Sequence, residues 1–166
     1  MAEFPHSADL RKGRSSEPGE AYLVTKCRVE GLKLALTEPP APEAIIKSIR
    51  WHQEQRLAHL LAFVVMPDHV HWVFVLGEKR SLDQVVKGFA SVTSREILRC
   101  RRLDPPVLWQ DEYHDHRLRS VERTWASMDY VHANPVRRGL CAKAEDWPWS
   151  TADPRYHEWV EGEYLG

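Results

Sequence analysis

Three segments have the hydrophobic pattern of β-strands. Residues 21–28 (AYLVTKCR) alternate between apolar and polar positions, as a half-buried strand requires. Residues 59–66 (HLLAFVVM) and 69–76 (HVHWVFVL) are mostly apolar, and the Pro-Asp pair between them is typical of a tight turn. So short a connection predicts an antiparallel hairpin. Shorter strands are expected at residues 107–109 and 113–119.

Three other segments carry apolar residues at the spacing of three and four that is typical of amphipathic helices. They are residues 42–57, 81–100 and 120–134. The second begins at Ser81, whose hydroxyl can cap the first turn of the helix. The third is expected to end before Pro135, because the residue that precedes a proline resists the helical conformation.

The order of these elements predicts the fold class. Strand, helix, hairpin, helix, strand and helix follow one another, which suits neither a doubly wound sheet nor a helical bundle. We therefore expect one α+β domain of the ferredoxin-like (split βαβ) kind, with helices packed on a central antiparallel sheet. We expect a mobile basic arm at residues 1–18, the folded domain at 19–143 and a Trp-rich tail packed on it at 144–166.

The composition restricts the compartment and the metal chemistry. The longest apolar run is too short to cross a bilayer, and no membrane association is expected. Three widely spaced cysteines and no secretory signal favour a reducing cytoplasm. Because the cysteines are not clustered, a metal would be held by histidine and oxygen ligands.

The net charge of −1 conceals an uneven distribution along the chain. Residues 79–143 contain most of the 23 Lys and Arg residues but only a third of the 24 Asp and Glu residues. This excess of positive charge suits a nucleic-acid partner, although a solvated helix face would give a similar count.

His69 and His71 form the first candidate site. They are two positions apart on a predicted strand, so both side chains project from the same face. Two imidazoles side by side provide half of a metal site and leave positions for an amide, water or a phosphate oxygen. Two half-exposed polar residues in an amphipathic strand would give the same pattern.

His114 and His116 form a second pair of this kind, within the charged segment YHDHRLR. This pair could contact DNA or a metal, and a structural or solvent-exposed role explains it equally well.

Tyr130 is the candidate nucleophile. In the helix at 120–134, we expect Val121, Trp125 and Met128 to face the core and Tyr130 to lie on the opposite, polar side. Asn134 follows one turn later on the same face as Tyr130. A nearby cation would favour ionisation of the phenol, whose ordinary pKa is about 10, and an amide oxygen is a suitable further ligand. The alternative is a surface tyrosine with an asparagine that ends the helix.

Four segments in order resemble the REP-associated tyrosine transposases, a branch of the HUH single-tyrosine nucleases in the IS200-like superfamily. They span more than half of the chain. The segments are PDHVHWVF (67–74), LWQDEYHDHRLR (108–119), DYVHANPVRRGL (129–140) and DWPWS (146–150).

The resemblance implies a metal-dependent cleavage of single-stranded DNA. Tyr130 would attack a phosphate, retain it as a 5′-phosphotyrosine and release a 3′-hydroxyl, which permits rejoining to another strand. His69, His71 and Asn134 would hold Mg²⁺ or Mn²⁺. The implied substrates are single-stranded or hairpin DNA of bacterial chromosomes. No protein partner is implied, and the chain would act as a monomer or a homodimer.

Basic residues near these motifs are candidates for DNA binding, although each also suits a solvated surface. They are Arg11, Lys12, Arg14, Arg99, Arg101, Arg102, Arg137 and Arg138.

Two other functions fit part of the pattern. A hairpin-DNA binding protein would keep the recognition surface without cleaving, and a metal-dependent phosphohydrolase would use water in place of the tyrosine. The set of His69, His71, Tyr130 and Asn134 is intact, which favours the transposase.

Overall fold

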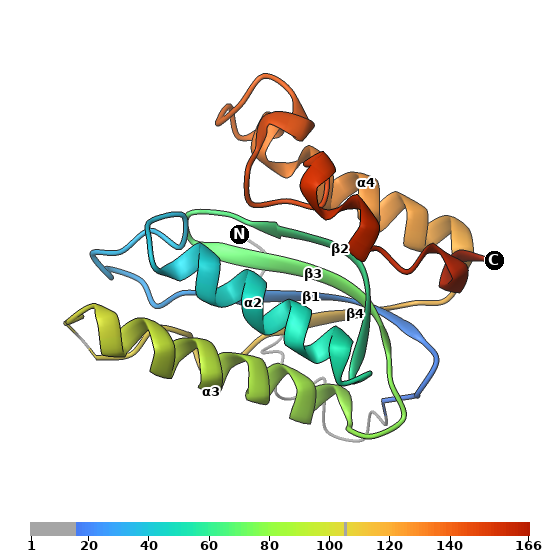
Figure 1. The fold of residues 1–166 in the computed structure, drawn as a ribbon, viewed down its shortest axis with the longest axis horizontal. Helices are drawn as coiled ribbons and strands as arrows, with labels where there is room; N and C mark the ends of the chain where they lie inside the picture. Colours follow the sequence, from blue (N-terminus) through green and yellow to red (C-terminus); the bar gives the residue numbers. More distant parts are fainter. Residues whose placement is uncertain (1–15, 105) are drawn as a thin grey trace, which may run out of the picture.

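The computed structural model describes residues 16–104 and 106–166, and a four-stranded sheet is its centre. The strands lie in the order β2-β3-β1-β4, and each neighbouring pair is antiparallel (Figure 1). This is the ferredoxin-like topology, so the predicted α+β fold class is confirmed. The expected arm, with Arg11, Lys12 and Arg14, lies almost wholly outside the described residues. The strands are β1 (Ala21–Cys27), β2 (Ala58–Val65), β3 (His69–Leu76) and β4 (His114–Leu118).

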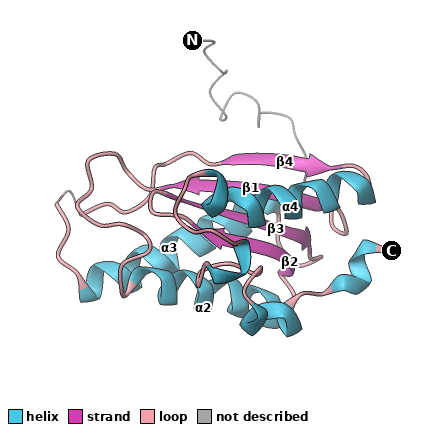
Figure 2. Ribbon diagram, turned by 90° about the horizontal axis from the view of Figure 1, so that it is seen from above, coloured by secondary structure: helices cyan, strands magenta, loops and turns pink. Residues whose placement is uncertain are grey.

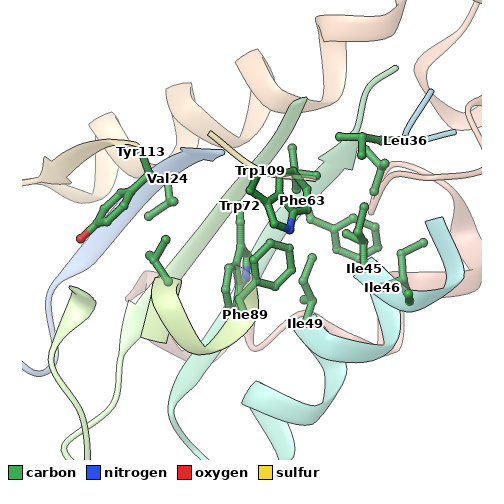
Figure 3. Close-up of a cluster of buried hydrophobic side chains, with 14 of the residues drawn as sticks. Val24, Leu36, Ile45, Ile46, Ile49, Phe63, Trp72, Phe89, Trp109 and Tyr113 are labelled. Carbon is green, nitrogen blue, oxygen red and sulfur yellow. The ribbon is translucent and has the colours of Figure 1, made fainter. Parts of the chain in front are cut away.

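Helices α2 (Ala41–Glu54) and α3 (Leu82–Cys100) cover one face of the sheet (Figure 1). Helix α3 begins with a capping box, in which Ser81 and Gln84 satisfy each other's backbone N–H groups. Phe63, Trp72 and Phe89 lie together in the core between these helices and the sheet (Figure 3). None of the described helices is both long and apolar enough to span a membrane.

Helix α4 (Val121–Arg137) lies on the opposite face (Figure 1). Its Met128 and Val131 pack on Leu61 and Val73 in a second, smaller core. In β2, an irregularity between Leu60 and Ala62 sends Leu61 and Ala62 to this same face. The sheet is therefore covered by apolar contacts on both faces.

Three short 3₁₀ helices follow α4, at Ala144–Asp146, Pro154–Trp159 and Gly162–Leu165. Between the first two, the chain runs along the outer edge of β2. The N–H of Val65 donates to the carbonyl of Trp149 (2.7 Å), and the N–H of Thr151 donates to the carbonyl of Phe63 (3.1 Å). These bonds satisfy backbone groups that an edge strand would otherwise expose.

Helix α4 differs from the sequence prediction in two ways. It continues past Pro135 to Arg137, because only one backbone bond is lost so near its end and Pro135 is itself buried. The residues that face the core include Thr124, Met128, Val131 and Pro135, at spacings of four, three and four. Val121 and Trp125, which we expected there, are 44% and 49% exposed. Their apolar side chains suggested the wrong orientation of the helix.

The strand expected at residues 107–109 was also wrong. Trp109 forms only an isolated bridge with Arg28. Two backbone hydrogen bonds flank this bridge, from the N–H of Val29 to the carbonyl of Leu108 (2.9 Å) and from the N–H of Gln110 to the carbonyl of Cys27 (3.0 Å). The Trp109 indole also donates a hydrogen bond to the Thr93 hydroxyl on α3 (2.9 Å), so a side-chain contact supports the short bridge.

Candidate active site between β3 and α4

The alternation of β3 directs its histidines toward α4. Val70, Trp72 and Phe74 point to the core under α2 and α3, whereas His69 and His71 share the other face with Val73. Their side chains therefore meet helix α4, which carries Tyr130.

Each histidine is held through its Nδ1 atom. Nδ1 of His69 lies 2.7 Å from a carboxylate oxygen of Asp68, and Nδ1 of His71 lies 2.8 Å from the hydroxyl of Thr25 on β1. The Nε2 atoms of the two histidines are 3.1 Å apart. When each Nδ1 donates its proton to its partner, both Nε2 lone pairs are free and converge on one point. Metal-binding histidines are commonly held in this way by carboxylate or hydroxyl groups.

Asp68 connects this pair to the end of α4. Its carboxylate also accepts a hydrogen bond from Arg138 (3.0 Å). Partial burial alone would raise the pKa of Asp68, but His69 and Arg138 outweigh it and lower that pKa below its ordinary value. Asp68 is therefore ionised at neutral pH and acts as the acceptor that orients His69.

His71 is 7% exposed. Burial, with the nearby His69 and Arg137, lowers the pKa of His71 to about 3. A neutral imidazole keeps a lone pair for a metal, which a protonated one does not. The surroundings of His71 therefore hold it in the form that a ligand requires.

Tyr130 and Asn134 lie one turn apart on α4. The rings of His71 and Tyr130 are 5.6 Å apart between centroids, and the guanidinium of Arg137 lies 4.2 Å from the centre of the Tyr130 ring. Tyr130 is 47% exposed, so a large substrate can reach its hydroxyl. Asn134 is 5% exposed and belongs to the buried side of the helix, in contrast to the polar side we expected.

The donor atoms suit a divalent cation with mixed nitrogen and oxygen ligands. The described residues contain no group of three His, Cys, Asp or Glu side chains placed to hold a metal. The two imidazoles would therefore need another type of donor, and the carboxamide of Asn134 is a suitable one. This set differs from a structural zinc site, which is closed by four Cys or His ligands.

The other sequence candidates lie in different places. Arg137 and Arg138 join the site through Tyr130 and Asp68. Arg99, Arg101 and Arg102 lie at the end of α3, on the far side of the sheet, where Arg101 donates a hydrogen bond to the carbonyl of Pro39. His114 and His116 are on β4, two strands away from His71. Thr25 and Asp68 were not predicted as site residues. Only Asp68 could have been found from the sequence, because it directly precedes His69.

The family follows from a sequence comparison. A family model described as "Transposase IS200 like" matches residues 23–134, which include His69, His71, Tyr130 and Asn134. The chain belongs to this family. The match runs from β1 into the last turns of α4 and so contains the two histidines, Tyr130 and Asn134 of this IS200-like transposase, whereas Arg137 and Arg138 follow just after it.

Individual relatives are more distant. An Escherichia coli K12 protein named REP-associated tyrosine transposase is 29% identical over 108 residues, which are 65% of this chain and 60% of that protein. A Haemophilus influenzae protein named for the same kind of transposase is 24% identical over 112 residues, which are 62% of this chain and 61% of that protein. Both alignments thus span less than two thirds of the relative.

A solved structure described as a REP-associated tyrosine transposase bound to a REP hairpin is similar in fold. Its TM-score is 0.67 at 22% identity, and the match covers 91% of this chain and 82% of that one. At this level of identity, the likeness shows that the two proteins share a fold.

Proposed function

We propose that this IS200-like transposase is a metal-dependent endonuclease that cleaves and rejoins single-stranded DNA beside a hairpin. The observation that carries the proposal is the meeting of Tyr130 with the converging Nε2 atoms of His69 and His71. A nucleophile next to two imidazole nitrogens that could bind a metal is the arrangement that metal-assisted phosphoryl transfer needs.

Tyr130 would carry out the covalent step. Its phenol oxygen attacks the phosphorus of the scissile phosphodiester, and its proton passes to solvent. The bond between phosphorus and the 3′-oxygen breaks, and that oxygen takes up a proton and leaves as a 3′-hydroxyl. Attack by another 3′-hydroxyl on the phosphotyrosine reverses these steps and joins two strands, because the phosphodiester energy is kept in the enzyme link.

The neighbours of Tyr130 would prepare this step. Arg137 stacks on the phenol ring and restrains its orientation, while Asp68 and Thr25 hold the histidines. Mg²⁺ or Mn²⁺ held by His69, His71 and Asn134 would polarise the scissile phosphate.

Hairpin DNA is the proposed substrate class. The fold is shared with a protein solved on a REP hairpin, and the E. coli relative is named for REP elements. Arg137 and Arg138 flank the site, and they are the best placed of the proposed DNA-binding residues. The remaining candidates, Arg99, Arg101 and Arg102, would contact a more distant part of the DNA. Contacts from Arg11, Lys12 and Arg14 are proposed from the sequence alone.

A cleavage assay tests the proposal. The protein is incubated with Mn²⁺ and labelled hairpins drawn from the DNA that flanks its gene, and the products are separated on a denaturing gel. We expect a covalent protein-DNA adduct that Tyr130→Phe abolishes. Tyr164→Phe is the matched control, since this exposed tyrosine lies in the tail and should leave the adduct unchanged.

The same assay separates the two alternatives. A binding protein without cleavage would leave the hairpins intact, and His69→Ala would not change its affinity. A phosphohydrolase would cut without an adduct and would keep its turnover in Tyr130→Phe. The proposal is abandoned if either pattern is found.

A further inference from the structure

The second histidine pair lies on the same sheet face as the candidate active site. His71 on β3 lies opposite Thr25 on β1, and Thr25 lies opposite His114 on β4. These residues form one row across three strands. Since neighbouring strands are about 4.8 Å apart, the Cα atoms of His71 and His114 are separated by about 10 Å. His116 follows on the same face, opposite Leu23.

Helix α4 leaves this face exposed at His114 and His116 of β4, although Leu23 and Leu118 beside them pack in the core under α4. It packs mainly on β2 and β3, whereas β4 is at the far edge of the sheet beside β1 (Figure 2). His114 and His116 are exposed. Thr25, on strand β1 between β3 and β4, is partly exposed. Within the described chain, neither imidazole of this pair has a hydrogen bond or an ion pair.

One side of α4 forms a wall beside this open surface. Arg123, Ser127, Tyr130, Asn134 and Arg137 are spaced by four, three, four and three residues, so they form one stripe along the helix. Two of the five carry positive charge. No ion pair joins either arginine to a carboxylate elsewhere in the described residues.

A contact on the other side of α4 shows which strands this stripe faces. There, Nε2 of His132 lies 2.7 Å from the hydroxyl of Thr151, in the segment that runs along the outer edge of β2. The Tyr130 stripe is on the opposite side of the helix axis and therefore faces β1 and β4. Together, the stripe, Thr25 and the exposed pair His114 and His116 form one polar surface that continues from His71 and Tyr130, and we refer to it as the β4 surface.

We propose that the β4 surface holds the single-stranded DNA next to the scissile phosphate, with the rings of His114 and His116 stacking on its bases. The proposal rests on the function proposed above and adds the path of the substrate. The two rings are about 6.6 Å apart along the strand, which leaves room for separate bases to contact them. Arg123 and Arg137 would pair with phosphates along the wall.

The chemistry of the β4 surface suits a single strand better than a duplex. Proteins that bind single strands combine a positive groove with rings on which bases stack, and histidine is one of the side chains used. Ferredoxin-like sheets of the RRM type bind RNA on the face opposite their two helices, which is an analogy for the open face here. A duplex would keep its bases stacked on each other and unavailable to the imidazoles.

Binding measurements on the full chain test the role of the β4 surface. All variants are made in the Tyr130→Phe protein, so that no DNA is cut, and anisotropy is recorded in EDTA with a labelled hairpin that carries a single-stranded extension. The double variant His114→Ala, His116→Ala is expected to bind this DNA about 10-fold more weakly or worse, as the loss of stacked bases predicts. Its affinity for the same hairpin without the extension should change less than 2-fold.

Two controls separate stacking from other effects. His114→Phe with His116→Phe keeps flat rings and should retain affinity within about 3-fold, because stacking does not need the ring nitrogens. His157→Ala removes an exposed histidine of the tail and should bind as the parent does. In a second measurement, a 5-iodouracil in the extension should cross-link to the peptide that contains residues 108–119 when the complex is irradiated.

Three results would overturn the proposal. They are unchanged affinity in the double alanine variant, an equal loss for both hairpins, or a loss in the phenylalanine variant as large as that in the alanine variant. Failure of the proposed function looks different. In that case, the unmodified protein gives no Tyr130 adduct with Mn²⁺, whatever the histidine variants do to binding.

Discussion

The two His-x-His pairs share a spacing and a sheet face, and His71 lies in one row with His114, yet their surroundings differ. In the first pair, the side chain of His69 is 13% exposed and His71 is 7% exposed, and each has a partner at Nδ1. His114 and His116 are exposed on the edge strand β4. The motif itself therefore does not make a metal site, and the residues around it decide its chemistry.

Helix α4 creates this difference. It lies over the first pair, adds Tyr130 and Asn134, and excludes water from His71. It does not reach over the second pair, whose rings stay free for a large ligand. One strand pattern thus supplies a buried pair, which we propose as metal ligands, and an exposed pair, which we propose stacks on DNA bases.

The largest contrast between the two pairs is expected in catalysis. His71→Ala should lower the rate of adduct formation by about 1,000-fold, because loss of the ion removes several kcal/mol of transition-state stabilisation. His114→Ala should keep a rate within about 3-fold of the unmodified protein when DNA is saturating. Single-turnover kinetics with Mn²⁺ measure both. Similar losses in the two variants would mean that the pairs do not have separate roles.

Metal binding to the folded protein should show the same contrast without DNA. At an Mn²⁺ concentration of about 100 times its Kd, the unmodified protein should gain about 2.7 kcal/mol, or roughly 5–10 °C in the melting temperature. The double variant His114→Ala, His116→Ala should show the same shift. His71→Ala should show almost none, and a full shift in this variant would place the ion elsewhere.

The partners of the first pair should matter less than the histidines themselves. Asp68→Asn and Thr25→Val remove the groups that hold the two Nδ1 atoms, and each should weaken Mn²⁺ binding by about 10-fold to 100-fold. Asp115→Asn is the matched control. Asp115 lies between His114 and His116 on β4 and is not one of the residues that hold His69 and His71. Isothermal titration measures the affinities. Equal effects at Asp68 and Asp115 would point to a general loss of negative charge.

Sequence reasoning predicted much of the first pair because its signals are local. Alternation in residues 69–76 placed His69 and His71 on one face, and helical spacing placed Asn134 one turn from Tyr130. Asp68 was also within reach of such reasoning, since it is adjacent to His69. Thr25 was not, because it is 46 residues from His71 and meets it only through the register of β1 and β3.

The orientation of α4 shows where local patterns fail. Val121 and Trp125 are apolar but exposed, whereas the polar Thr124 and Asn134 are buried. Periodicity shows that a helix has two sides, but the neighbouring elements determine which side is covered. For the same reason, no local pattern indicated that His114 lies in a row with His71, since their strands are joined only through β1.

The smallest expected effect concerns a histidine outside both pairs. It tests whether burial of a histidine makes the fold less stable at acid pH. His52 belongs to α2, away from both pairs, and is 1% exposed. Burial lowers the pKa of His52, and the charge of Arg80 adds to this, although a bond to the Ser48 carbonyl opposes it. The folded protein therefore takes up this proton at a lower pH than the unfolded chain, whose value is about 6.5.

The stability of the protein should therefore fall at acid pH. Below a pH of about 6.5 the unfolded chain binds the proton first, so His52 makes the protein less stable as the pH falls, by up to about 1.4 kcal/mol per pH unit. His52→Asn keeps a donor for the Ser48 carbonyl but cannot titrate. Urea unfolding at pH 7.5 and 5.5 should show a smaller loss of stability in His52→Asn than in the unmodified protein. The exposed control His116→Asn should keep the full loss. Equal losses in all three proteins would show that burial of His52 does not contribute to the acid sensitivity of the fold.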